Sequence, residues 1–309
     1  MDRASPESDS VLGVAPPWAG AKAPYRDPGL PRPLEAITLS HPAVPPSLEG
    51  LRILHLSDLH VRRRRRAAAG TRWARLLEAL STARADLVAY TGDYMDEPGD
   101  EPAALDALAQ LAEHVERVMA PRLGQWGVFG NHDTPALRAA ARHAPRVRWM
   151  DAELSPAVRD RRTGHAAPLR VLGLSWPEDP LAALLEGGDD PGQARRPAGE
   201  FVLTLAHYPT TLAALSDLRL PLALAGHTHG GQIRLHPRLI PHTSCDLPPT
   251  HASGLVRLGG TLCAISRGLG EGVADGLRVN CPPQAPLYTL RRGPLGGAAG
   301  PGLVQVQAW

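Results

Sequence analysis

The chain turns at Ala225-Gly226-His227-Thr228-His229-Gly230-Gly231-Gln232, directly after the apolar run from Leu220 to Ala225. This run predicts a buried strand that ends at Gly226. The three glycines permit an irregular turn in which the backbone can approach a bound group closely. We expect the rings of His227 and His229 to diverge in this turn and to serve two neighbouring metal positions, because imidazole is the commonest protein ligand for transition metals. Two partly exposed loop histidines are the alternative.

Four other predicted strands also end in a small group of Asp, His or Asn residues. These strands cover residues 51–56, 86–91, 127–130 and 201–206, and helices are predicted at 71–84, at 102–119 and from Pro135. The groups that follow the strands are Asp58-Leu59-His60, Gly92-Asp93-Tyr94-Met95-Asp96, Asn131-His132-Asp133 and His207. Ligands of open α/β sheets collect outside the carboxyl ends of strands. We therefore predict one site built from separate strand ends.

The ordered set of groups resembles the five-block signature of the calcineurin-like metallophosphoesterases. The blocks are Asp58-x-His60, Gly92-Asp93-x-x-Asp96, Gly130-Asn131-His132-Asp133, His207 and Gly226-His227-x-His229. Each block alone is a weak signal, whereas the ordered set is specific. The segments Ser266-Arg267-Gly268-Leu269-Gly270 and Asn280-Cys281-Pro282-Pro283 resemble a bacterial branch of small cytoplasmic and membrane-associated phosphodiesterases. The resemblance implies a four-layer α/β/β/α sandwich of two mixed sheets flanked by helices.

The resemblance also implies two divalent metal ions. Asp58, His60 and His229 would bind the first ion, Asn131, His207 and His227 would bind the second, and Asp93 would bridge the two. Mixed nitrogen and oxygen ligands suit Mn, Fe, Zn, Ni or Co and do not choose among them. The implied activity is hydrolysis of a phosphodiester or pyrophosphate bond by attack of a metal-bridging hydroxide.

Three further residues have roles that follow from the resemblance. His132 would face the substrate and assist the leaving group, and Asp96 would hold the tautomer of His132, with a surface carboxylate or helix cap as the alternative for Asp96. Glu97 stands where phosphoprotein phosphatases place an arginine, so protein-phosphatase activity is not expected. Arg267 is the predicted substrate-binding residue, with a structural role as the alternative. The run Arg62–Arg66 is either a solvated loop or an electropositive rim.

The composition limits the range of substrates and partners. A formal net charge of +2 and an aromatic content of 4% argue against a nuclease, which needs a basic groove with stacking aromatics. We expect a small phosphorylated substrate, with lipid-linked and nucleotide-linked molecules both open, and a lipid substrate predicts an apolar groove beside the metals. The alternatives are a phosphomonoesterase, or a scaffold of the same fold without catalysis. Oligomeric state is left open.

The chain organisation predicts one main domain. Residues 1–36 read as a Pro-rich mobile arm, residues 37–292 as the metallophosphoesterase domain, and residues 293–309 as a Gly/Pro-rich tail. No apolar run approaches the roughly 18 residues of a membrane helix, and the polar N-terminus lacks the layout of a secretory signal. We expect a cytoplasmic protein, with peripheral association at a membrane as the alternative.

Overall fold

Two β-sheets lie face to face in the computed structural model, which describes residues 10–11, 32–63, 66–144, 146–176, 199–214, 220–235, 239–258, 261–272, 277–294, 296–299, 302–303 and 307–308. The larger sheet contains β2 (Leu34–His41), β3 (Arg52–Leu56), β4 (Leu87–Thr91), β5 (Gln125–Val128), β6 (Val147–Trp149), β13 (Ala285–Arg292), β14 (Gly296–Ala299) and β15 (Gly302–Leu303). The smaller sheet contains β7 (Ala152–Leu154), β8 (Leu169–Leu174), β9 (Phe201–Ala206), β10 (Leu222–Ala225), β11 (Gly254–Leu258) and β12 (Thr261–Ile265). A separate antiparallel pair joins β1 (Ser10–Val11) to β16 (Gln307–Ala308).

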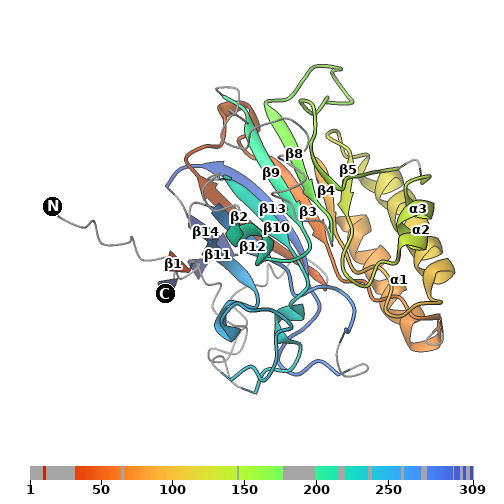
Figure 1. Cartoon of the computed structure of the whole chain (residues 1–309). Helices are drawn as coiled ribbons and strands as arrows, with labels where there is room; N and C mark the ends of the chain where they lie inside the picture. The colour runs from red at the N-terminus through yellow and green to blue at the C-terminus, as the bar shows by residue number, and fades with distance from the viewer. Residues whose placement is uncertain are drawn as a thin grey trace.

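Both sheets are mixed, as predicted. Their orders are β15-β14-β2-β13-β3-β4-β5-β6 and β11-β12-β10-β9-β8-β7. Strands β3 to β6 are parallel, and so are β8, β9, β10 and β12. Parallel neighbours need a crossover connection, which α1 (Arg66–Thr82), α2 (Glu101–Met119) and α3 (Pro135–Ala141) supply on the outer face of the larger sheet (Figure 1). The carboxyl ends of the parallel strands therefore lie along one edge of each sheet.

Alternating side chains of the strands divide the core into layers. Ile53 and Ala89 point between the sheets and join a cluster with Leu203 and Leu224. Their neighbours in the larger sheet point outward and pack with α1 and α2, in a cluster that includes Leu54, Tyr90, Leu80 and Leu111. The outer face of the smaller sheet is covered, within the described ranges, by the short α5 (Thr211–Ala214) and by the loop that carries Leu247. The four-layer sandwich is thus confirmed.

The sequence pattern also predicts strands at Ile37–Ser40, at residues 157–159 and at residues 233–235, and all three differ from the structure. The short edge strand predicted at Ile37–Ser40 is the eight-residue β2, which is interior because it pairs with β13 on one side and with β14 on the other. The strand predicted at residues 157–159 is only a bridge between Arg159 and Ala166, and β7 forms earlier in the chain. The strand predicted at residues 233–235 is a single bridge between Ile233 and Val279.

The predicted arm and tail each contribute to the larger sheet. Leu34–Ala36, placed in the arm, belongs to β2, and Gly296–Ala299, placed in the tail, is β14. The sequence pattern also predicts a short helix at residues 180–185, which lies outside the described residues, as does most of the arm. The proposed domain boundaries stay predictions. No helix in the described part of the chain is long and apolar enough to cross a membrane.

Candidate metal centre

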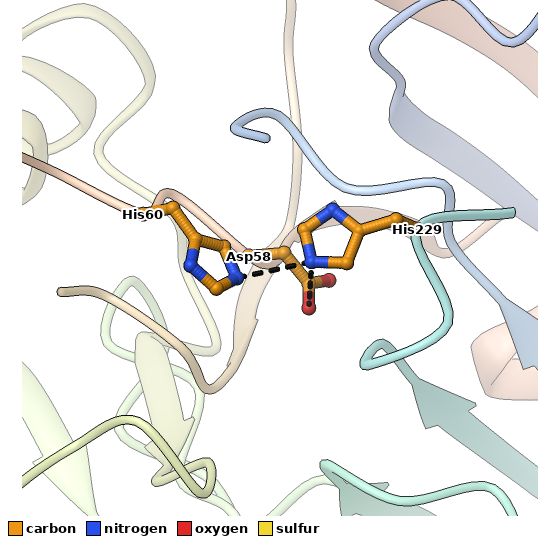
Figure 2. A group of neighbouring side chains, drawn as sticks. All are labelled: Asp58, His60 and His229. Carbon is orange, nitrogen blue, oxygen red and sulfur yellow. Dashed lines mark hydrogen bonds and ion pairs between the residues drawn. The ribbon is translucent and has the colours of Figure 1, made fainter. Parts of the chain in front are cut away.

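The strand ends of both sheets bring the predicted ligands together. Asp58, His60 and His229 each place one ligand atom within 4.8 Å of the others, and Asp93, His207 and His227 form a second group by the same measure (Figure 2 shows the first). All six residues are buried. The Oδ1 atom of Asn131, the seventh predicted ligand, lies 3.1 Å from Nε2 of His207. The two groups match the two predicted half-sites.

The first half-site is a cluster of inward-facing acceptor atoms. The Nε2 atoms of His60 and His229 lie 3.0 Å apart, and His229 Nε2 lies 3.7 Å from Asp58 Oδ1 (Figure 2). Asp58 Oδ2 is buried and has no hydrogen-bond partner among the described residues. An unpartnered carboxylate oxygen beside two converging imidazole nitrogens is costly unless a cation or proton lies between them. This donor set therefore fits a divalent metal ion.

Asp93 lies between the two half-sites. Its Oδ2 atom is 3.1 Å from His207 Nε2 and 3.5 Å from His60 Nε2, one histidine from each group. Its Oδ1 atom accepts the backbone N–H of His132 at 2.9 Å. One carboxylate oxygen thus faces a histidine of each group while the other accepts a backbone N–H, so Asp93 lies between the two half-sites.

Three of the histidines are oriented by acceptors on their outer sides. His60 Nδ1 donates to the Asp96 carboxylate at 2.9 Å, His207 Nδ1 donates to the Thr91 carbonyl at 2.7 Å, and His227 Nε2 donates to the Ser244 carbonyl at 2.6 Å. These acceptors assign the proton of each ring to its outer nitrogen, so the inner nitrogen keeps its lone pair. Outer hydrogen bonds of this kind fix the tautomer and raise the basicity of metal-binding histidines.

The backbone of the site is held in a rare conformation. Asp58, His60, Asp93, His227 and His229 have φ angles of 52°, 42°, 56°, 70° and 50°. Residues other than glycine adopt this left-handed region at a cost of about 1–3 kcal/mol each, and such residues gather at functional sites. The two histidines of the opening stretch belong to different groups, so the predicted divergence of their rings is confirmed. Gly130 permits the close approach, because a Cβ there would collide with Asp93 Oδ1.

Buried charges of opposite sign shift the pKa values across the site. Burial lowers the pKa of His60, but the hydrogen bonds that its ring donates to the Asp93 and Asp96 carboxylates outweigh burial and raise the pKa to about 10. Burial opposes protonation of His207 too, yet the charge of Asp93 raises its pKa to about 9. Burial and the positive charge of His207 lower the pKa of His227 to about 4. The buried carboxylates therefore demand positive charge between them, which a divalent ion would supply.

Asp133 organises the loops around the site, a role that the sequence reasoning missed. Its buried carboxylate accepts the backbone N–H groups of Asp93, Tyr94 and Gly130 at 2.9, 2.8 and 2.7 Å. Burial and the nearby charge of Asp93 raise the pKa of Asp133 to about 6. Its position directly after His132 in the third motif block was the available signal, but nothing in the sequence shows which way the carboxylate points.

Asp96 acts on a different histidine from the one predicted. Its carboxylate binds His60 Nδ1 at 2.9 Å and Arg62 Nε at 2.7 Å. His132 is held instead by the backbone carbonyl of Asp96, which lies 2.6 Å from His132 Nδ1. The prediction that this carboxylate holds the tautomer of His132 is therefore wrong, because Arg62 and His60 together draw the side chain away. Arg62, the first residue of the arginine run, supports the site through Asp96.

Arg267 is a structural residue, the alternative left open above. Its side chain is 4% exposed, forms an ion pair with Glu35, and donates from Nε to the Pro282 carbonyl at 3.0 Å. Glu35 also accepts from Gln284 at 2.7 Å. These contacts favour the structural alternative over the predicted substrate-binding role of Arg267, because β2 and the loop after residue 280 enclose the guanidinium. Of the arginine run, Arg64 and Arg65 lie outside the described residues.

Comparisons with known proteins show the family of the chain. The family model for calcineurin-like phosphoesterases matches residues 51–231. The chain is 25% identical over 256 residues to the uncharacterized metallophosphoesterase YkuE of Bacillus subtilis (strain 168), covering 82% of this chain and 84% of that protein. It is 29% identical over 215 residues to the phosphodiesterase YaeI of Escherichia coli (strain K12), covering 66% and 70%.

A further relative covers less of its own length. The chain is 26% identical over 189 residues to the uncharacterized metallophosphoesterase YkoQ of Bacillus subtilis (strain 168), and it spans 64% of that protein. Among solved structures, a dimetal phosphatase from Danio rerio aligns with 72% of this chain and 88% of its own, with a TM-score of 0.41 and 13% identity. The family match alone covers more than half of the 309 residues. The chain therefore belongs to the calcineurin-like phosphoesterase family, and its activity class is that of a metal-dependent phosphoesterase.

Proposed function

We propose that this protein uses two divalent metal ions to hydrolyse a phosphodiester or pyrophosphate bond. The observation that carries the proposal is the position of Asp93, whose Oδ2 atom faces His207 in one group and His60 in the other. Asp58, His60 and His229 would hold one ion, Asn131, His207 and His227 would hold the other, and Asp93 would contribute to both. When bound, such a pair supplies Lewis-acid polarisation of the phosphoryl group and an activated water.

The remaining chemistry belongs to the chain's own residues. Asp96, Thr91 and Ser244 orient the histidines so that their lone pairs face inward. His132 is only partly buried, and its ring centroid lies 4.8 Å from that of His60. Because its Nδ1 atom is engaged by the Asp96 carbonyl, Nε2 is the atom free to meet a substrate oxygen. Since Nδ1 keeps its proton on the carbonyl, Nε2 carries a proton only in the imidazolium form, and we assign to that form the delivery of a proton to the leaving oxygen.

The test is a hydrolysis screen of purified protein after chelation and reloading with Mn, Zn, Ni, Fe or Co. The substrates are a phosphodiester and a phosphomonoester with the same chromogenic leaving group, and a pyrophosphate. The proposal expects metal-dependent cleavage of a diester or pyrophosphate. Preference for the monoester would favour the phosphomonoesterase alternative, and metal binding without turnover on any substrate would favour the scaffold.

Asp96 contacts His60 through its carboxylate and His132 through its backbone carbonyl, and one substitution separates these two contacts. Replacing Asp96 with Asn should lower metal affinity about 10- to 100-fold, the usual cost of losing an outer hydrogen bond to a metal-binding histidine. The backbone carbonyl that holds His132 is kept in this variant. At saturating metal, turnover should therefore return to near the wild-type rate. Titration with Mn, read both as bound metal and as activity, checks this, and a turnover defect that persists at saturation would restore the discarded pairing with His132.

A further inference from the structure

An apolar groove lies directly beside the metal centre. It has a volume of about 430 Å³, and His60 and Arg62 form part of its wall. This volume falls within the roughly 300–1,000 Å³ of small-molecule sites. We call it the α1–α2 groove, because its floor and sides come from α1, α2, the loop after β3 and the loop at residues 269–271. None of the roles assigned above uses it.

The lining of the groove consists largely of aliphatic and aromatic side chains. The apolar residues include Leu59, Val61, Trp73, Leu76, Ala107 and Leu269. Leu59 and Leu76 are buried, and Val61, Trp73 and Leu269 are partly buried against the same core cluster. Ala103 and Ala107 lie four residues apart on α2, so both point to one face of the helix, where their small side chains leave room. The groove is thus an opening into the edge of the hydrophobic core.

The groove and the metal centre share a wall. The His60 ring borders the groove, while its Nε2 atom lies 3.0 Å from Nε2 of His229. Glu271 lines the groove, and a Cβ on the next residue, Gly272, would lie 2.7 Å from His229 Nε2. The groove and the candidate metal centre are therefore adjacent, with His60 common to both.

The charge around the groove selects the kind of ligand. Four arginines line it, Arg32, Arg62, Arg72 and Arg75, against two carboxylates, Asp106 and Glu271. Arg62 pairs with Asp96, and Arg72 pairs with Glu271. Arg32 and Arg75 are exposed at the rim. This net positive rim attracts an anionic head group and disfavours a cationic one.

We propose that the α1–α2 groove binds the linear apolar chain of an amphiphilic phosphate. The binding of the chain does not depend on the proposed function. The identification of the bound molecule as the substrate does rest on that function, and the protein would then cleave a phosphoester that carries an alkyl or acyl chain. The apolar chain would lie along Leu76 and Ala107, with the phosphate held by the metal centre and the arginine rim. This places a lipid-linked substrate ahead of a nucleotide-linked one.

The first test measures binding and needs no turnover. Isothermal titration calorimetry of the full chain compares methyl, butyl, octyl and dodecyl phosphate below their micelle-forming concentrations. Each methylene buried in the groove should improve affinity about fourfold, so dodecyl phosphate should bind at least about 10²-fold more tightly than butyl phosphate. Equal affinity along the series would overturn the proposal, because the groove would then be closed to a chain or filled by another part of the protein.

Matched variants on one helix locate the effect. Ala107→Phe should fill the groove and remove most of the gain between butyl and dodecyl phosphate. Ala109→Phe, the same change at an exposed position of α2, should keep the gain. Ala103→Phe provides a second filling variant should Ala107→Phe not fold. If the gain survives in a folded filling variant, the chain binds elsewhere and the proposal is wrong. A chain-length gain without hydrolysis in the metal screen would support the groove and reject the proposed reaction.

Discussion

Replacing Asp93 with Asn should abolish metal-dependent hydrolysis, with a loss of at least about 10³-fold in turnover. Asp93 is 1% exposed, and its Oδ2 atom faces a histidine of each predicted half-site. The substitution removes the charge that both ions would share. The transition-state stabilisation supplied by a bound metal amounts to several kcal/mol, and each 1.36 kcal/mol is a factor of about ten in rate.

Metal content must be measured beside activity in this experiment. We expect wild-type protein to bind about two ions and Asp93→Asn to bind fewer, as read by elemental analysis after dialysis against Mn. Asp151→Asn is the matched control, because Asp151 is a surface residue paired with Arg142. Full activity in Asp93→Asn would reject the bridging role. Wild-type metal content together with lost activity would move Asp93 from metal binding to a direct role in the reaction.

The positions of the ligands could be predicted from the sequence because each ligand group directly follows a predicted strand. A buried apolar run predicts a strand, and parallel neighbours place their carboxyl ends at one edge. The ends of β3, β4, β9 and β10 therefore bring Asp58, Asp93, His207 and His227 into one region. The spacing of His227 and His229 across a glycine-rich turn was enough to predict that the two rings separate.

The direction of a side chain depends on neighbours that are distant in sequence. The Asp96 carboxylate turns to His60 because Arg62 is beside it, and both partners come from the loop after β3. Arg267 is enclosed by Glu35, more than two hundred positions earlier in the chain. Neither partner could be chosen from a motif, since several acids and arginines were equally available. The α1–α2 groove could not be predicted from the sequence either, because an opening at the edge of a core depends on how side chains pack and not on the hydrophobic pattern.

Replacing His132 with Ala should depress turnover by about 10²-fold or more while metal content stays at the wild-type level. The imidazole Nδ1 atom is engaged by the Asp96 carbonyl at 2.6 Å, which directs Nε2 away from that loop. The backbone N–H of residue 132, which holds Asp93 at 2.9 Å, remains in the variant. The metal-binding groups should therefore be undisturbed, and the expected loss is the usual value of a positioned proton donor.

The leaving group decides whether His132 donates a proton or only shapes the site. para-Nitrophenolate departs readily from a phosphodiester without protonation, whereas an alkoxide does not. The defect of His132→Ala should therefore be small for the nitrophenyl ester and large for the alkyl ester. His143→Ala, at an exposed histidine after α3, is the control and should match wild type on both. An equal loss on the two esters would contradict proton donation, because a general acid matters in proportion to the basicity of the oxygen that departs.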